Sequence, residues 1–192
     1  MSQQSSSPGP LRADARRNAD QIRQAALDVF RERGLTVPLE DVATAAGVSK
    51  ATVFNRFGGR IGLVEAVIEE VVAAELRRII DSTRSLPDPG AMPGHYITAI
   101  RDLQYDRPAA NDVLLQERPH SQQLMEICHA AEQIYGEVVA AGHAHGTLRP
   151  ECTQDDLHAL VVDTALALKH RPRPARADYD RRTAFILAGV GG

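Results

Sequence analysis

The sequence contains little cysteine, no tryptophan and no long apolar segment. Its 192 residues include two cysteines, Cys128 and Cys152, which are too few for a disulfide framework. No apolar run approaches the roughly 20 residues that a membrane-spanning helix requires, so we expect no membrane partner. The N-terminal segment also lacks the apolar stretch of a secretory signal. These absences favour a reduced, cytoplasmic protein, long enough for one large domain or two small ones.

The charge is distributed unevenly along the chain. The formal net charge is −3, which by itself argues against a nucleic-acid partner. Residues 1–60, however, contain nine Arg and Lys against six Asp and Glu, whereas residues 61–192 contain thirteen against nineteen. This asymmetry is typical of a small basic binding module attached to an acidic body.

Helical periodicity covers most of the chain after a polar N-terminal segment. Residues 2–10 are rich in Ser, Gln and Pro, so we expect residues 1–11 to form a disordered arm. Apolar residues at the 3.6-residue spacing of a helix follow from there to the C-terminus. They predict helices at about 14–33, 39–46, 50–57, 60–83, 93–103, 109–116, 124–142, 154–169 and 178–188. No segment alternates like a strand, so we predict an all-α fold of about nine helices.

Particular residues define the expected helix ends. Ser49 is a suitable N-cap for the 50–57 helix, and Thr153 with Asp156 resembles a capping box. Gly142 and Gly189 are expected to end their helices, which would put His143 and His145 in a loop.

Residues 38–57 have the pattern of a helix-turn-helix. In that motif one helix braces the DNA backbone while a second enters the major groove. Gly47 provides the tolerant residue that the turn needs, and Val42 and Val53 are placed to lock the helices together. The second helix carries small, polar or basic residues suited to reading base edges: Lys50, Ala51, Thr52, Asn55 and Arg56. The alternative interpretation is an ordinary helical hairpin with a solvated polar face.

The N-terminal region resembles the DNA-binding region of the TetR family of transcriptional regulators. The resemblance is carried by "ALDVFRERG" (26–34), "LEDVATAAGVSKATVFNRF" (39–57) and the basic residue Arg60. It implies a three-helix head over residues 12–60 and a C-terminal ligand-binding and dimerisation domain over 61–192. It also implies contacts with bases or phosphates at these positions: Thr36, Ser49, Lys50, Ala51, Thr52, Asn55, Arg56 and Arg60.

Three positions depart from the family pattern. Phe54 replaces a common Tyr whose hydroxyl often reaches a phosphate, Arg56 replaces a common His, and Gly58-Gly59 replaces a frequent Pro-Ser or Pro-Asn. The phosphate contacts of the family therefore do not all transfer to this chain. Arg12, Arg16 and Arg17 allow two interpretations, an arm reaching the DNA or a solvated run of charge.

The C-terminal part resembles the family's effector domains more loosely. Residues 144–161 resemble a stretch found before the eighth helix in one branch of the family, and residues 178–190 resemble its closing helix. The resemblance implies a homodimer through the eighth and ninth predicted helices, with two recognition helices set ~34–36 Å apart to read a near-palindromic operator.

Several residues between 96 and 135 could line a pocket for an unknown small-molecule effector. The candidates are Tyr96, Leu103, Gln104, Leu114, Arg118, Met125, Cys128, His129 and Tyr135. Ordinary core packing is the alternative for each of them. The histidines and cysteines do not have the spacing of a zinc site, and no catalytic constellation is visible. We therefore expect no metal, no cofactor and no enzymatic activity.

These features predict a homodimeric transcriptional regulator that binds double-stranded DNA. We expect it to be a repressor that a small-molecule ligand releases from its operator. An activator fits the same residues. A second alternative is a ligand-binding or interaction module of this fold that no longer reads an operator, which Phe54 and Gly58-Gly59 favour. A third is a hydrolase or metal enzyme in the helical body, which would carry a tightly bound metal.

Overall fold

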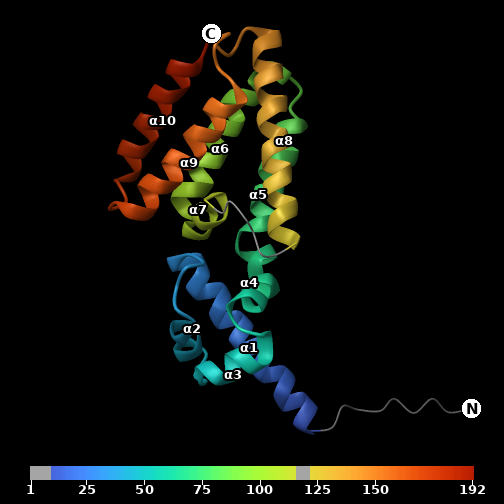
Figure 1. The fold of residues 1–192 in the computed structure, drawn as a ribbon. Helices are drawn as coiled ribbons and strands as arrows, with labels where there is room; N and C mark the ends of the chain where they lie inside the picture. The colour runs from blue at the N-terminus through green and yellow to red at the C-terminus, as the bar shows by residue number, and fades with distance from the viewer. Residues whose placement is uncertain (1–9, 116–121) are drawn as a thin grey trace, which may run out of the picture.

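The computed structural model describes residues 10–115 and 122–192, and every regular element in those ranges is helical. This confirms the predicted all-α fold. The elements are shown in Figure 1: α1 (Pro10–Arg33), α2 (Leu39–Ala45), α3 (Lys50–Phe57), α4 (Arg60–Ile68), η1 (Glu69–Ala73), α5 (Ala74–Arg84), η2 (Pro89–Ala91), α6 (Met92–Asp106), α7 (Pro108–Leu114), α8 (Gln122–His145), α9 (Gln154–His170) and α10 (Arg176–Val190).

The predicted helix over residues 60–83 is one continuous helical segment with a defect in its middle. A π-helical turn, η1, separates α4 from α5 without a break in the chain. With these three elements taken together, the described residues form the nine helices that we predicted. The π turn lies where the segment passes α1, and the Glu70 carbonyl oxygen accepts a hydrogen bond from Arg31 of α1 at 3.1 Å.

Helices α1 to α4 form a head at one end of the molecule, and α5 to α10 form the body (Figure 1). Helix α4 is part of the head because it packs against α1 and α3. Fully buried side chains from all four helices meet there, including Phe30, Val42, Val53 and Leu63. The same apolar cluster continues through α5 and α6 into the body.

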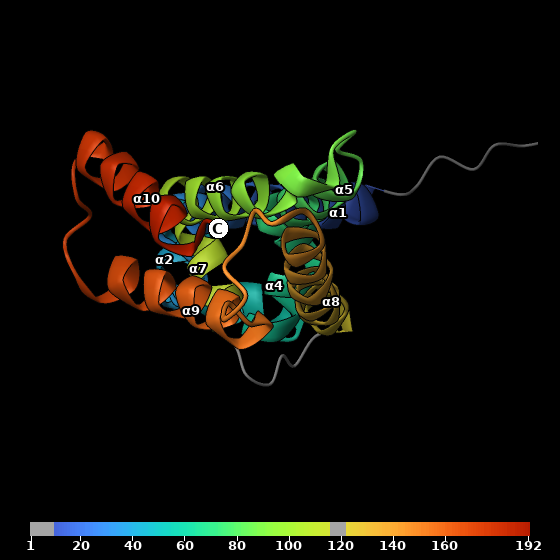
Figure 2. The ribbon, with the colours of Figure 1, turned by 90° about the horizontal axis from the view of Figure 1, so that it is seen from above.

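In the body, α6 contacts α5, α7, α8 and α9, and it is also the helix against which α10 packs. Seen along the long axis of the molecule, α10 lies at one edge, away from α8 (Figure 2). The helix α9 begins with the predicted capping box. Thr153 Oγ1 accepts from the Asp156 amide at 3.2 Å, and the Asp156 carboxylate accepts from the Thr153 amide at 2.8 Å.

Three predicted helix boundaries were wrong. The first helix begins at Pro10 rather than Asp14, so Pro10 and Leu11 belong to it and not to the expected arm. The helix α8 continues through Gly142 to His145, which places His143 and His145 in its last turn. The helix α10 likewise continues through Gly189 to Val190.

Packing explains why Gly142 does not end its helix. A Cβ atom at Gly142 would lie 2.6 Å from the Leu148 side chain, so this glycine permits the returning chain to approach closely. The left-handed residue that does end the helix is Gly146, with φ +65°.

Candidate nucleic-acid interface

The turn between α2 and α3 has the geometry that a helix-turn-helix requires. Gly47 has φ +65°, a conformation that side-chain-bearing residues rarely adopt. The Ser49 hydroxyl accepts the Thr52 amide hydrogen at 3.1 Å, which confirms Ser49 as the N-cap of α3. Gln21 of α1 donates to the Ala46 carbonyl oxygen at 2.9 Å and so attaches the turn to α1. These bonds fix the direction in which α3 points.

One face of α3 is buried and the other is exposed. Val53 is fully buried, whereas Lys50, Ala51, Asn55 and Arg56 are exposed. Thr52 is half-buried, and its hydroxyl lies 2.8 Å from that of Ser49. Five of the predicted contact residues therefore share the outer surface of α3, beside the capping Ser49. Thr36 is also exposed, but it lies in the turn before α2.

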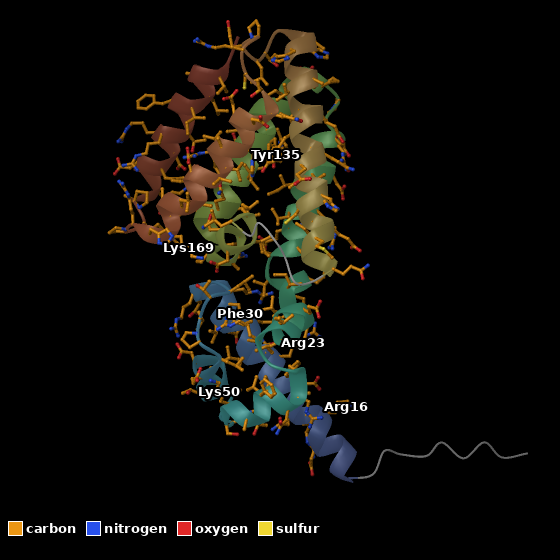
Figure 3. All side chains as sticks on the ribbon, in the orientation of Figure 1. Arg16, Arg23, Phe30, Lys50, Tyr135 and Lys169 are labelled. Atoms are coloured by element: carbon orange, nitrogen blue, oxygen red, sulfur yellow. The ribbon has the colours of Figure 1, made fainter. Side chains whose placement is uncertain are left out.

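Lys50 is paired within the head. Its ammonium group contacts the Glu40 carboxylate of α2, and both side chains are more than half exposed. The hydrogen bond from Lys50 holds the pKa of Glu40 below its ordinary value, so Glu40 remains ionised at neutral pH. Figure 3 shows Lys50 at the end of the molecule opposite the body.

Arg60 is engaged with the backbone of the head. Its guanidinium donates to the carbonyl oxygens of Leu35, at 2.5 Å, and Val37, in the turn between α1 and α2. The side chain is half-buried and ties the start of α4 to that turn. This role in the fold was not predicted, and a phosphate contact by Arg60 stays a prediction.

The Gly58-Gly59 junction has two successive left-handed residues. Gly58 has φ +71° and caps α3 by donating to the Phe54 carbonyl oxygen at 2.8 Å. Gly59 has φ +95° and ψ −158°, a region available essentially to glycine alone. The Phe54 ring packs over Gly59, 3.1 Å from the position of an added Cβ atom, and remains 57% exposed. The junction thus explains why glycines replace the family's more common residues.

A cavity of about 820 Å³ lies in the body, bounded by residues of α7, α8 and α9. Five predicted pocket residues line it: Leu114, Met125, Cys128, His129 and Tyr135. Among the lining residues that were not predicted, Glu132 and His158 are polar. Glu132 lies one turn after Cys128 on α8, and this spacing is the signal that could have identified it.

The remaining predicted pocket residues lie elsewhere. Tyr96 is buried behind the cavity, with its ring edge-on to Tyr135 at 5.9 Å. Gln104 is fully buried and donates to the Val161 carbonyl oxygen at 2.8 Å, and Leu103 faces another hollow. These three side chains do not line the α7–α9 cavity, and their contact with a ligand stays a prediction. Arg118 lies outside the described residues.

Burial keeps two groups in the cavity wall, the Cys128 thiol and the Tyr135 phenol, uncharged at neutral pH. It raises the pKa of the Cys128 thiol, with a smaller contribution from Glu132. It also raises the pKa of Tyr135 to about 12. At neutral pH the thiol and phenol are therefore protonated, so the wall contributed by Cys128 and Tyr135 is neutral.

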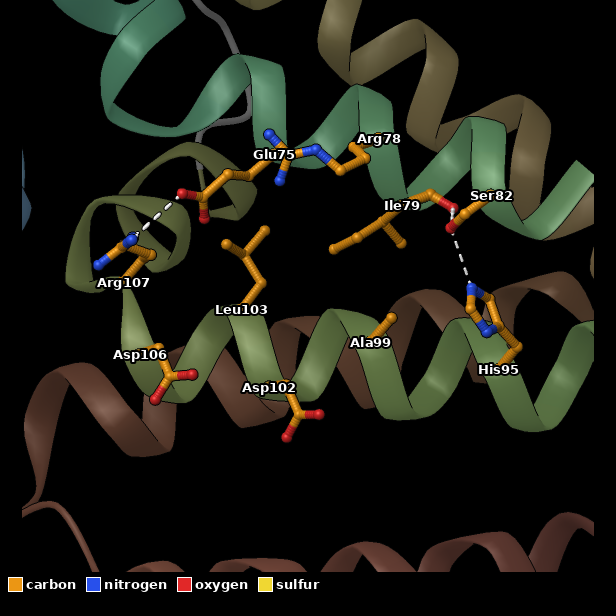
Figure 4. A pocket seen from close by; sticks show the side chains of 10 residues that line it. All are labelled: Glu75, Arg78, Ile79, Ser82, His95, Ala99, Asp102, Leu103, Asp106 and Arg107. Atoms are coloured by element: carbon orange, nitrogen blue, oxygen red, sulfur yellow. Dashed lines mark hydrogen bonds and ion pairs between the residues drawn. The ribbon is translucent and has the colours of Figure 1, made fainter.

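Leu103 contributes to a second, open hollow of about 550 Å³ between α5 and α6 (Figure 4). Two pairs of its polar side chains contact each other. Arg107 contacts Glu75 at 3.3 Å, and Ser82 lies 3.0 Å from His95 Nε2.

In the described part of the chain, no three or more His, Cys, Asp and Glu side chains gather closely enough to hold a metal ion. None of the described helices has the length and apolar character needed to cross a membrane.

Residues 22–67, from the middle of α1 to near the end of α4, match the family model described as "Bacterial regulatory proteins, tetR family". A 56-residue stretch is 45% identical to the HTH-type transcriptional regulatory protein RaaS of Mycobacterium tuberculosis. That match spans 29% of this chain and 26% of the relative, about a quarter of its length.

Solved structures extend the similarity to the body. A TetR transcription regulatory protein from Mycobacterium vanbaalenii is 27% identical, with a TM-score of 0.51 over 95% of this chain and all of that one. The ketosteroid transcriptional regulator KstR2 of Mycobacterium tuberculosis has a TM-score of 0.65 over 92% of this chain and 95% of its own, at 16% identity, which shows a shared fold. Residues 22–67 therefore have the sequence of a TetR-family DNA-binding region, and the solved structures show that the rest of the chain shares the fold of such regulators.

Proposed function

We propose that the protein is a homodimeric, sequence-specific DNA-binding repressor that a small molecule releases from a near-palindromic operator. The observation that carries the DNA-binding half is α3, whose buried face is fixed in the head while its outer face exposes Lys50, Asn55 and Arg56. Arg or Lys can pair with guanine and Asn with adenine in the major groove. Such a regulator works on the chromosome, which implies the cytoplasmic location expected from the sequence.

Homodimerisation through α9 and α10 is supported by their outer surfaces. Phe185 of α10 is a large apolar side chain that is 68% exposed, and Leu166 of α9, which also lines the cavity, is 42% exposed. Phe185→Asp should therefore give a monomer in analytical ultracentrifugation. Ile61→Asp, at a site 52% exposed on the head, is the matched control and should leave the dimer intact.

Ligand binding is assigned to the cavity between α7, α8 and α9. Its wall joins apolar side chains such as Leu114 and Met125 to a few polar groups, the usual composition of a small-molecule site. A ligand can release DNA only to the extent that it prefers one arrangement of the heads over the other.

The test of the DNA-binding half is fluorescence anisotropy with the DNA upstream of the protein's own coding region and with a library of genomic fragments. We expect saturable binding to one sequence over a scrambled duplex. Asn55→Ala should weaken it by about 1–3 kcal/mol, whereas Gln133→Ala, an exposed amide on α8, should not. Equal, weak binding to all duplexes would contradict the proposal.

Equal, weak binding to all duplexes would favour a module of the same fold that does not read an operator. Two observations support this second candidate: Phe54 has no hydroxyl for a phosphate, and Lys50 is already paired with Glu40. A reporter gene placed under the bound fragment distinguishes a repressor from an activator, since deletion of the regulator raises expression in the first case and lowers it in the second.

A further inference from the structure

One carboxylate connects the head to two walls of the cavity. Asp112 lies on α7, and its Oδ2 accepts the backbone amide hydrogen of Leu35, just after the end of α1, at 2.5 Å. Its Oδ1 accepts from the ammonium group of Lys169, near the end of α9. Only 8% of the Asp112 side-chain surface is exposed. Three elements from distant parts of the sequence therefore meet at one nearly buried charge.

The end of α1 is shaped to receive this carboxylate. Gly34 has φ +83° and donates to the Phe30 carbonyl oxygen at 3.0 Å, which closes the helix. A Cβ atom at Gly34 would lie 2.4 Å from Asp112 Oδ2. The carboxylate thus occupies the space that a side chain would fill, and only glycine permits both the conformation and the contact.

Both helices that hold the carboxylate also form the cavity wall. Val113 and Leu114 follow Asp112 directly on α7, and Leu166 lies one turn before Lys169 on α9. Figure 3 shows Lys169 at the end of α9 that is nearest the head. A molecule that enters the cavity and moves α7 relative to α9 must change the distance between Asp112 and Lys169.

A second attachment of α1 to the rest of the chain does not involve the residues that line the cavity. Arg23 pairs with the Glu70 carboxylate, and Arg31 donates to the Glu70 carbonyl oxygen at 3.1 Å. These bonds join α1 to the π turn η1, none of whose residues lines the cavity. Of these two attachments, the one at Asp112 is the one that the contents of the cavity can alter.

Building on the proposed function, we propose that Asp112 is a positioning residue that couples the α7–α9 cavity to the DNA-binding head through Leu35 and Lys169. A nearly buried carboxylate is stable only while its partners are in place, because losing one leaves a charge without compensation. Movement of Lys169 away from Asp112 therefore weakens the hold of Asp112 on the end of α1. The head then changes its position on the body.

Hydrogen exchange of the Leu35 amide tests this coupling without DNA. In the full chain, Asp112→Ala should make that amide exchange about tenfold faster or more, while the amides of α2 keep their rates. Asp163→Asn, at an exposed carboxylate on α9, is the matched control and should change neither. Lys169→Met, which keeps the bond to Leu35 but removes the ion pair, should give an intermediate rate. Lys169→Met also tests the coupling if Asp112→Ala does not fold.

A tethered occupant then tests the link to the cavity. Cys128 lines the cavity, so N-phenylmaleimide attached to it, in a Cys152→Ser background and confirmed by mass spectrometry, places an apolar group there. Labelling should speed Leu35 exchange about fivefold or more with Asp112 present, and add nothing in Asp112→Ala. Unchanged Leu35 exchange after complete labelling would overturn the inference, as would an equal increase in both proteins.

Anisotropy on the same samples separates this inference from the proposed function. If labelling weakens operator binding but Leu35 exchange does not respond, the coupling is wrong and the ligand-released repressor stands. If Leu35 responds as expected and no DNA fragment is bound specifically, the coupling is correct and the operator function fails.

Discussion

The ammonium group of Lys50, the first residue of α3, is paired with the carboxylate of Glu40 on α2. A phosphate or a guanine must compete with Glu40 for this lysine when the head meets DNA. The carboxylate is itself exposed, so it also places a negative charge close to the expected path of the DNA backbone. Glu40 therefore competes with DNA for Lys50.

Replacing Glu40 by Gln should strengthen binding to DNA. The change frees Lys50 and removes one repulsive charge, so we expect affinity about two- to fivefold higher at moderate salt and a salt slope steeper by up to ~0.9. Anisotropy over a salt series measures both. Glu151→Gln, at an exposed position in the loop before α9, is the control and should leave both unchanged. Weaker binding by Glu40→Gln would mean that Glu40 positions Lys50 instead of competing for it.

Phe54→Tyr should strengthen DNA binding by a different route. The ring is exposed and lies over Gly59, so a hydroxyl at its tip extends outward from the end of α3. A neutral donor to a phosphate contributes about 0.5–1.5 kcal/mol, or roughly two- to tenfold in affinity. Because a hydroxyl releases no counterion, the salt slope should stay constant, in contrast to Glu40→Gln. A changed slope would show that the hydroxyl rearranges the basic residues.

The head was predicted well because local rules determine it. Ser49 caps α3 through a bond three residues away, and Gly47 meets a backbone requirement of its own turn. Contacts between side chains on different helices leave no such local signal in the sequence. The pairing of Lys50 with Glu40 and the binding of Arg60 to the turn before α2 depend on how the helices pack.

The cavity was predicted only in part for a related reason. An apolar stripe shows which face of a helix is buried but not which neighbour covers it. Cys128 faces the cavity, whereas Gln104 is bound to α9. Gly142 shows a second reason for error. The sequence does not distinguish a glycine that permits close packing, as here, from one that ends a helix.

Gly62→Ala should disrupt the connection between α3 and α4. An added Cβ atom would lie 1.8 Å from the Phe57 carbonyl oxygen, which is backbone and can yield only if α3 shifts. We expect a loss of about 3 kcal/mol in the free energy of unfolding, with weaker DNA binding. Gly94→Ala is the matched control in α6, where the added atom meets nothing within 4 Å. It should stabilise by about 0.5–1 kcal/mol, and denaturant unfolding measures both. Equal effects at the two sites would contradict the expected clash.

The ion pair between Arg84 of α5 and Glu137 of α8 should make stability depend on pH in the acid range only. Both bonds are 2.8 Å, and the pair holds the pKa of Glu137 below its ordinary value, chiefly through the hydrogen bond from Arg84. A lowered carboxyl pKa stabilises the fold fully above the unfolded value, near 4.3 for Glu, and the contribution disappears as pH falls through the folded pKa.

Both side chains are about 40% exposed, so solvent screening limits the contribution to about 1 kcal/mol or less. Urea unfolding of the native chain and of Glu137→Gln should therefore differ by a constant amount between about pH 6 and 8. The difference should shrink as the pH falls below about 4.3, the unfolded value, and through the lower folded pKa of Glu137. Arg84 keeps its charge throughout, because Glu137 raises its pKa further. A difference that stays constant as the pH is lowered through this range would show that the amide perturbs packing between α5 and α8, and that the ion pair is not the cause.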